Sequence, residues 1–185
     1  LTYDLMMKNA GRNLAEAVMD LMRAAETEEE QQVLGLVGPG NNGGDTLVAL
    51  ARLAEKGWKA RAYLVKRKAG NDPLIDHLEE ARGEICLAED DEGFQRLQSF
   101  IETADVLLDG ILGTGFKLPL KEEIGQILAA AQEILAEAEF PPLVVAVDCP
   151  SGVDCETGQA AAETIPADVT VTMAAVKQGL LKLPA

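Results

Sequence analysis

The sequence predicts an α/β fold, a three-layer sandwich in which a mostly parallel sheet has helices on both faces. Three observations lead to this prediction. Short apolar runs alternate with longer segments in which apolar residues recur every three or four positions, as strands and helices do in α/β proteins. The short runs are apolar at consecutive positions, which is typical of strands buried on both faces. Glycine-rich or carboxylate-bearing loops follow three of these runs.

Each helix is predicted from its apolar periodicity and from residues that start or stop helices. The first helix carries an amphipathic stripe along its whole length. Asp45 is expected to cap the second helix and Gly57 to end it, while Asn71 and Pro73 start the third. The predicted helices cover residues 3–24, 45–56, 71–82, 94–103 and 122–137.

The strands are predicted from the apolar runs between these helices. They cover residues 33–38, 59–65, 84–88, 104–109 and 143–148, with a β-rich stretch at 167–173. The 185 residues, of which 48% are hydrophobic, suit one Rossmann-like domain, 1–185, with its own core. Because the chain begins at Leu1 instead of Met and stops abruptly at Ala185, we expect it to be a domain truncated at both ends.

The composition limits the partners and the compartment. The net charge of −15 repels nucleic-acid phosphates and acidic membrane surfaces. No apolar stretch approaches the roughly 18 to 20 residues that span a bilayer. Cys86, Cys149 and Cys155 form no CxxC pair, which favours a reducing compartment. We therefore expect a cytoplasmic protein that binds neither nucleic acid nor membranes.

Three loops are expected to form one site. The stretch GPGNNGGD (38–45), Asp109 with its following loop, and Asp148 with its following loop each come directly after a predicted strand. In an open parallel sheet the ligand lies outside the carboxyl ends of the strands, so these loops converge there. Each loop alone fits a simple turn or helix cap, but the three together favour a binding site.

The first loop contains a GxGxxG pattern at Gly38, Gly40 and Gly43, which alone is weak evidence for a dinucleotide site. The second strand ends in Lys66 and Arg67 instead of the acidic residue that holds ribose hydroxyls. An ordinary NAD dehydrogenase is therefore disfavoured, although the basic pair tolerates a 2′-phosphate. The asparagine and aspartate side chains of the loop suit something polar beyond a pyrophosphate.

The chain carries four motifs in order from about Leu5 to Lys177: LMMKNAGR, GPGNNGGD, LLDGILGTGF and VVAVDCPSGVDCETG. Together they resemble the YjeF N-terminal domain, the NAD(P)HX epimerase family. The resemblance implies a Rossmann-like fold and an isomerase that interconverts the R and S forms of the hydrated cofactors NADHX and NADPHX, a metabolite-repair reaction. It also implies a bound potassium ion, a homodimer formed through the N-terminal helix, and an NAD(P)HX dehydratase as a separate or fused functional partner.

The resemblance also assigns residues, position by position. It implies that Asp148 contacts the substrate and acts as the acid/base, and that Asn42, Asp109 and Ser151 bind potassium. The implied substrate-binding residues are Asn41, Asn42, Gly43, Gly44, Asp45, Gly113, Thr114, Gly115, Phe116, Lys117, Leu118, Pro119 and Asp148. Modest departures from the family pattern at Thr46, Cys149 and Val176 remove none of these groups.

These residue types agree with the implied chemistry. We expect a carboxylic acid to protonate the C6 hydroxyl, which leaves with help from the ring nitrogen before water returns to the other face. Partial burial of Asp148 would raise its pKa toward a useful value. Ring opening is an alternative route that uses the same group. The N–H groups of Gly43 and Gly44 are expected to bind the pyrophosphate, with Lys117 as a candidate partner.

Other candidates are weaker, and two further function classes remain open. His77 is interpreted as structural, and Cys149 lacks a nearby base that would make it a nucleophile. The alternative to the epimerase is a non-catalytic scaffold with the same fold, which would be free to lose the polar groups at 42, 109, 148 and 151. A nucleotide-dependent oxidoreductase is the third possibility, and it predicts hydride transfer.

Overall fold

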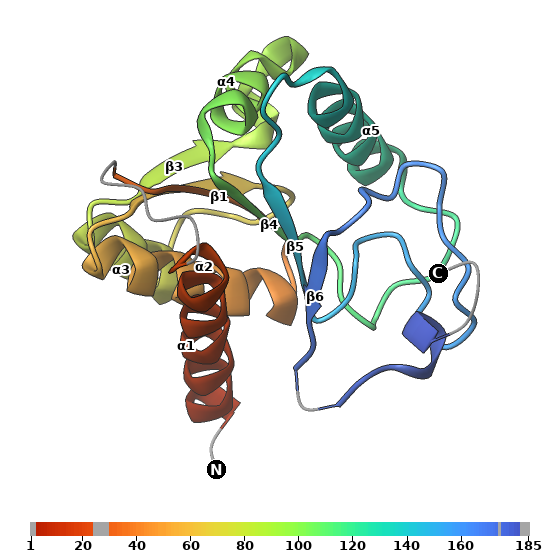
Figure 1. The fold of residues 1–185 in the computed structure, drawn as a ribbon, viewed down its shortest axis with the longest axis horizontal. Helices are drawn as coiled ribbons and strands as arrows, with labels where there is room; N and C mark the ends of the chain where they lie inside the picture. The colour runs from red at the N-terminus through yellow and green to blue at the C-terminus, as the bar shows by residue number, and fades with distance from the viewer. Residues whose placement is uncertain (1–2, 24–29, 174, 182–185) are drawn as a thin grey trace.

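A six-stranded parallel sheet forms the centre of the protein in the computed structural model, which describes residues 3–23, 30–173 and 175–181 (Figure 1). The strands are β1 (Gln32–Val37), β2 (Lys59–Leu64), β3 (Glu84–Leu87), β4 (Val106–Gly110), β5 (Leu143–Val147) and β6 (Val169–Val171). They are ordered β3-β2-β1-β4-β5-β6, and every neighbouring pair is parallel. This is the Rossmann-like order, so the predicted fold class is confirmed.

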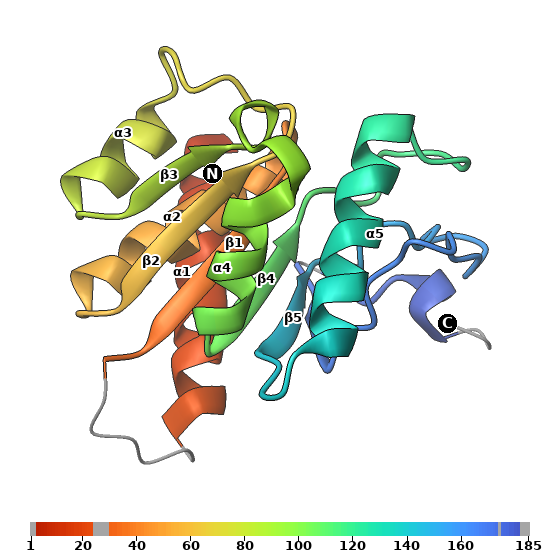
Figure 2. The same cartoon turned by 90° about the horizontal axis from the view of Figure 1, so that it is seen from above.

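Helices cover both faces of the sheet, as predicted (Figure 2). They are α1 (Tyr3–Met22), α2 (Asn41–Glu55), α3 (Pro73–Glu80), α4 (Gln95–Thr103) and α5 (Glu122–Glu137), with a 3₁₀ turn at Gln178–Leu181. The first three helices pack on one face, with α1 against α2, and α4 and α5 pack on the other. The predicted end of the first helix at Ala24 lies outside the described residues. Among the helices described, none is both long and apolar enough to cross a bilayer.

The central strand β1 shows why the strands are apolar at consecutive positions. Its Val33 and Val37 side chains belong to the core beneath α1, α2 and α3. The alternate residues Leu34 and Leu36 belong to the core beneath α4 and α5. All four are fully buried, and burying each contributes about 1.5 to 3 kcal/mol. The two cores hold the strand ends in place, and the site is built on those ends.

The start of α2 differs from the prediction. The helix begins at Asn41 with Gly40 at the N-cap, so Asp45 is its fifth residue and the expectation that it caps the helix is wrong. Glycine is a poor helix former, so the sequence predicts a loop at positions 43 and 44. In the structure both glycines lie inside α2, and a Cβ atom at Gly43 would overlap the carbonyl oxygen of Gly38.

Several other boundaries differ from the prediction by one to a few residues, and two of them bear on the site. The side chain that caps α3 is Asp72, which accepts a hydrogen bond from the backbone N–H of Leu74, so the expected start at Asn71 is wrong. Strand β5 ends at Val147, one residue before the predicted end. Asp148 leaves the strand with φ of 68°, in the left-handed region.

Candidate active site

A cavity of about 760 Å³ lies beyond the carboxyl ends of β1, β4 and β5. Strands β1 and β4 are neighbours in the sheet although two other strands separate them in sequence, so the cavity sits where the strand order reverses. The predicted site residues that line it are Asn41, Asn42, Asp45, Gly113, Thr114, Gly115, Phe116, Lys117, Pro119 and Asp148. The structure thus brings the three loops together around one cavity.

The remaining predicted residues lie elsewhere. Gly43 and Gly44 are buried in the first turns of α2, and Leu118 faces an adjoining groove between its own loop and α5. Asp109 and Ser151 are buried and are not among the residues that line the cavity. Ser151 accepts a hydrogen bond from the N–H of Leu112, which does line it.

Gly43 is required because the first turn of α2 lies very close to Gly38 in the loop that precedes it. A Cβ atom at this position would overlap the carbonyl oxygen of Gly38. We expect Gly43→Ala to lower the free energy of unfolding by about 2 to 3 kcal/mol, since the backbone must shift to admit a methyl group. Gly40→Ala is the matched control, because a Cβ atom there meets open space, and it should cost less than about 1 kcal/mol. Equal urea-unfolding curves for the two variants would contradict this packing argument.

The N-terminus of α2 presents backbone donors at the cavity. The first helical hydrogen bond joins the N–H of Gly44 to the carbonyl of Gly40 at 3.2 Å, so the N–H of Gly44 is occupied and the expectation that it binds a phosphate is wrong. The N–H groups of Asn42 and Gly43 also precede this bond, and Gly40 provides no side-chain cap. Backbone donors at a helix N-terminus favour an anion.

The basic residues after β2 form ion pairs within the protein and do not line the cavity. Arg67 forms an ion pair with Asp72 at 2.7 Å and donates to the carbonyls of Gly38 and Gly40 at 3.1 and 3.2 Å. Lys66 pairs with Glu123 of α5. The Arg67 guanidinium therefore braces the first loop, and it is not available for the 2′-phosphate that the sequence suggested.

Asp109 and Ser151 join the ends of β4 and β5. The Ser151 hydroxyl and backbone N–H donate to the two Asp109 carboxyl oxygens at 2.5 and 2.7 Å, and the hydroxyl accepts from the N–H of Leu112 at 2.9 Å. Burial raises the pKa of Asp109, against the opposing effect of the bonds from Ser151. In the described part of the chain no basic side chain pairs with Asp109.

Asn42 adds an amide to this buried group. Its Nδ2 atom donates to the carbonyls of Leu112 and Val147 at 2.8 and 2.5 Å, so its side chain lies between the loops after β4 and β5. A buried carboxylate without a basic partner, next to amide, hydroxyl and carbonyl oxygens, is a donor set that fits a hard monovalent cation. Within residues 3–23, 30–173 and 175–181, no cluster of three or more His, Cys, Asp or Glu side chains is placed to hold a metal.

Asp148 is fixed by the C-terminal segment. Its Oδ1 atom accepts from the N–H of Met173 at 2.7 Å and is paired with Lys177 Nζ, which also donates to the carbonyl of Met173 at 2.8 Å. Its left-handed backbone turns the side chain out of the β5 direction and into the cavity. Sequence reasoning missed Lys177, for which the only signal was a basic residue beyond the last β-rich stretch.

A second buried carboxylate, Asp45, also faces the cavity. Burial, and secondly the negative charge of Asp148, raise the pKa of Asp45 to about 6. Burial also raises the pKa of the Cys149 thiol, so little of the reactive thiolate forms, which agrees with the expectation that Cys149 is not a nucleophile. His77 lies near Glu55 and Glu80 and does not line this cavity.

Comparison with known proteins connects this site to a family. Residues 4–179 match the model of the YjeF-related protein N-terminus. The chain is 34% identical over 171 residues to the NAD(P)H-hydrate epimerase of Microbacterium testaceum, covering 92% of this chain and 63% of that protein. It is 36% identical over 182 residues to the enzyme of the same name from Clavibacter michiganensis subsp. michiganensis, covering 97% and 75%.

Two further matches extend the comparison. The chain is 31% identical to the bifunctional NAD(P)H-hydrate repair enzyme Nnr of Thermofilum pendens over 98% of its own length, but it spans only 33% of that protein. The crystal structure of the yeast protein YNL200c has a TM-score of 0.80 to this chain at 26% identity, covering 98% of this chain and 74% of the yeast chain. The chain thus aligns almost throughout with proteins that are longer than itself.

Proposed function

Because the chain belongs to the family of the YjeF-related protein N-terminus, and because its relatives are named NAD(P)H-hydrate epimerases, we propose that it interconverts the R and S forms of NADHX and NADPHX. The observation that carries the proposal is the position of Asp148. It is a buried carboxylate at the strand-order reversal, turned into the cavity and held there by Lys177 and Met173. A scaffold has no need of this arrangement.

In the proposed reaction Asp148 exchanges a proton with the C6 hydroxyl of the hydrated ring. Protonation lets the hydroxyl leave as water while the ring nitrogen supplies electrons to C6, and water then adds to the opposite face. The N–H groups of Asn42 and Gly43 at the start of α2 would bind the cofactor's pyrophosphate, and loop 113–119 would cover it. The exposed Lys117 stays a candidate phosphate partner.

We also propose a potassium ion held by Asn42, Asp109 and Ser151. These residues come from α2, β4 and the loop after β5, and they already contact one another or shared carbonyls. Potassium would compensate the buried charge of Asp109 and fix the three loops that surround the substrate. The protein's own part is to present these oxygens and to exclude water from Asp109, which is 1% exposed.

The proposed function is tested by incubating the full-length protein with (R)-NADHX or (R)-NADPHX in potassium buffer and following the S form by chromatography. We expect conversion at least 100-fold faster than the spontaneous rate, since positioned acid/base groups contribute about that much or more. Running the reaction in ¹⁸O-labelled water separates the two routes, because hydroxide loss places one solvent oxygen at C6 per turnover. A folded protein that binds the hydrate without accelerating its conversion would support the scaffold.

Three further expectations, two from the resemblance and one from the composition, stay predictions. A dehydratase that consumes the S form is the expected functional partner, and the bifunctional name of the Thermofilum relative is compatible with fusion of two activities. A homodimer through α1 is compatible with its exposed Leu5, Met6 and Leu21. A cytoplasmic location, without nucleic-acid or membrane partners, follows only from composition.

A further inference from the structure

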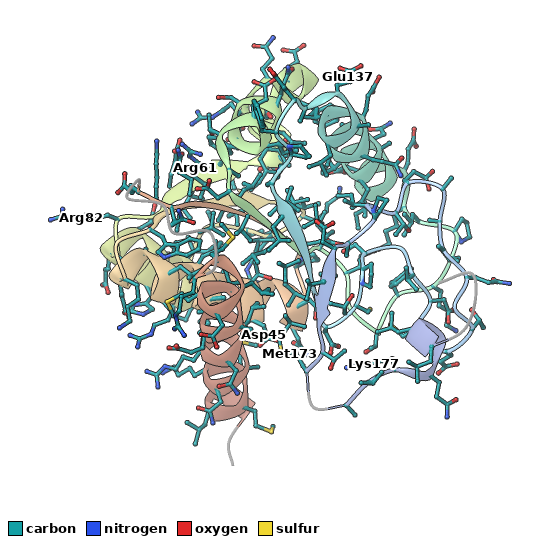
Figure 3. The ribbon with its side chains drawn as sticks, in the orientation of Figure 1. Asp45, Arg61, Arg82, Glu137, Met173 and Lys177 are labelled. Atoms are coloured by element: carbon teal, nitrogen blue, oxygen red, sulfur yellow. The ribbon has the colours of Figure 1, made fainter. Side chains whose placement is uncertain are left out.

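Two buried carboxylates with different surroundings line the same cavity. Asp45 comes from α2 and is 8% exposed, and Asp148 comes from the loop after β5 and is 9% exposed. They are near enough for the charge of Asp148 to act on Asp45. Figure 3 labels Asp45, Met173 and Lys177; the N–H of Met173 donates to Asp148, which Lys177 also contacts.

The two carboxylates differ in their partners. Asp148 has an ammonium group and a backbone N–H on Oδ1. For Asp45, no side chain or backbone donor of the described residues forms a hydrogen bond or ion pair with the carboxyl group. Asp148 is therefore held by donors at its carboxyl group, whereas Asp45 is buried without a donor from the described residues, where a proton stabilises it.

Ordinary structural roles do not account for Asp45. It is the fifth residue of α2, beyond the first turn, and Gly40 occupies the N-cap, so its side chain neither caps the helix nor lies at its end. Burying a carboxyl group without a donor costs stability. A group that carries such a cost while facing a cavity is typical of a functional site.

We propose that Asp45 is a second catalytic residue, which acts together with Asp148 as a pair of acid and base from two walls of the cavity. This inference rests on the proposed epimerase function and extends it. Because one oxygen leaves from one face of the ring and another returns to the opposite face, a proton donor on the first face and a proton acceptor on the second serve the two steps. The two different carboxylates supply both in one enzyme form.

The steps balance as follows. The Asp45 carboxylic acid gives its proton to the C6 hydroxyl, the C6–O bond breaks with its electrons to release water, and the ring nitrogen lone pair forms a C=N bond. A water on the other face donates a lone pair to C6 as the C=N electrons return to nitrogen, and the Asp148 carboxylate takes the water's proton. The opposite conversion runs the steps backward, and exchange with solvent resets the pair.

Besides Asp45 and Asp148, the charged residues that line this cavity are Lys117 and Lys121, in the segment before α5. Lys177, in the segment after β6, pairs with Asp148, and β4 contributes Asp109, which is buried and bonded to Ser151. The basic residues of α1 and α2, Lys8, Arg12 and Arg52, line a separate cavity with His77 and Asp72 of the α3 region. Among the charged groups, Asp148 is the one that raises the pKa of Asp45, after the larger effect of burial.

The test is Asp45→Asn in the full-length protein, with Asp76→Asn, an exposed carboxylate on α3, as the matched control. We expect kcat for R to S conversion to fall at least 100-fold with KM changed less than threefold, and the control to stay within twofold. In the wild type, kcat/KM should decrease as the pH rises through about 6, because the proton on Asp45 is then lost.

A melting series supplies a readout that does not depend on turnover. The folded protein keeps the Asp45 proton up to about pH 6, whereas an unfolded carboxyl loses it near 3.8. Charged Asp45 therefore destabilises the fold increasingly from pH 4 to 6 and constantly above. Asp45→Asn should melt about 5 to 10 °C higher than the wild type at pH 8, with the difference shrinking toward pH 4.

The outcomes separate the two proposals. If the wild type epimerises and Asp45→Asn retains more than a third of kcat, the catalytic role of Asp45 is overturned while the function stands. If Asp45→Asn melts below the wild type at pH 8, Asp45 is a structural residue and the inference fails. If the wild type shows no conversion, the epimerase and the role of Asp45 fail together.

Discussion

Asp148→Asn is expected to lower the rate of epimerisation about 1000-fold and to leave a folded protein. Loss of a positioned acid/base group typically costs between about 100-fold and 10,000-fold. The asparagine keeps an oxygen for the N–H of Met173, and its backbone tolerates the φ of 68° at this position. The substitution removes the carboxylate beside Lys177 that accepts the proton. The measurement is kcat by chromatography at saturating substrate, with the melting temperature as the folding check.

The control for this substitution comes from the same loop. The Asp154 side chain accepts from the N–H groups of Glu156 and Thr157 at 2.9 and 2.8 Å, bonds that an asparagine preserves, and it does not line the cavity. Asp154→Asn should therefore keep its rate within about twofold of the wild type. If Asp148→Asn retained more than a tenth of the wild-type rate, Asp148 would not be the acid/base.

The second large effect concerns the cation. We expect potassium chloride to raise the free energy of unfolding of the wild type by about 2.7 kcal/mol at 100 times the dissociation constant, because a ligand of the folded state stabilises it by mass action. Asp109→Asn should abolish this increase, since it removes the one full negative charge of the proposed site. Urea unfolding in potassium chloride and in choline chloride, at equal ionic strength, measures both.

A matched control lies at the opposite end of the same strand. Asp105 precedes β4 and accepts from the N–H of Gln32 at 2.7 Å, far from the proposed ligands along the strand. Asp105→Asn should keep the full potassium effect even if it costs some stability. Identical unfolding of the wild type in the two salts, or a potassium effect that survives in Asp109→Asn, would contradict the proposed site.

The sequence predicted the elements that depend on local pattern. Alternating apolar runs and helical stripes identified all six strand regions and five helices, because each strand is buried on both faces and each helix on one. The convergence of the loops after β1, β4 and β5 followed from the parallel sheet alone. These features require no knowledge of which distant residues touch.

Features made by distant contacts were not predictable in the same way. The helical start at Asn41 is not visible in the sequence because glycine has a low helix propensity, and only the structure shows Gly43 packed against Gly38. Lys177 reaches Asp148 from 29 residues away, only because the chain returns past β6. The sequence predicts Asp45 as a cap because aspartate is common at helix N-caps. Only the structure places it inside α2, where its carboxyl group has no hydrogen-bond donor among the described residues.

The left-handed backbone at Asp148 has a consequence for the evolution of this fold. Asparagine and aspartate tolerate that conformation and glycine adopts it freely, whereas most other residues pay about 1 to 2 kcal/mol for it. The substitutions tolerated best at this position are therefore asparagine and glycine. Both remove the carboxylate without disturbing the sheet. A lineage released from selection for turnover would lose its chemistry before it lost its domain. It would inherit an intact cavity that evolution could reuse for binding.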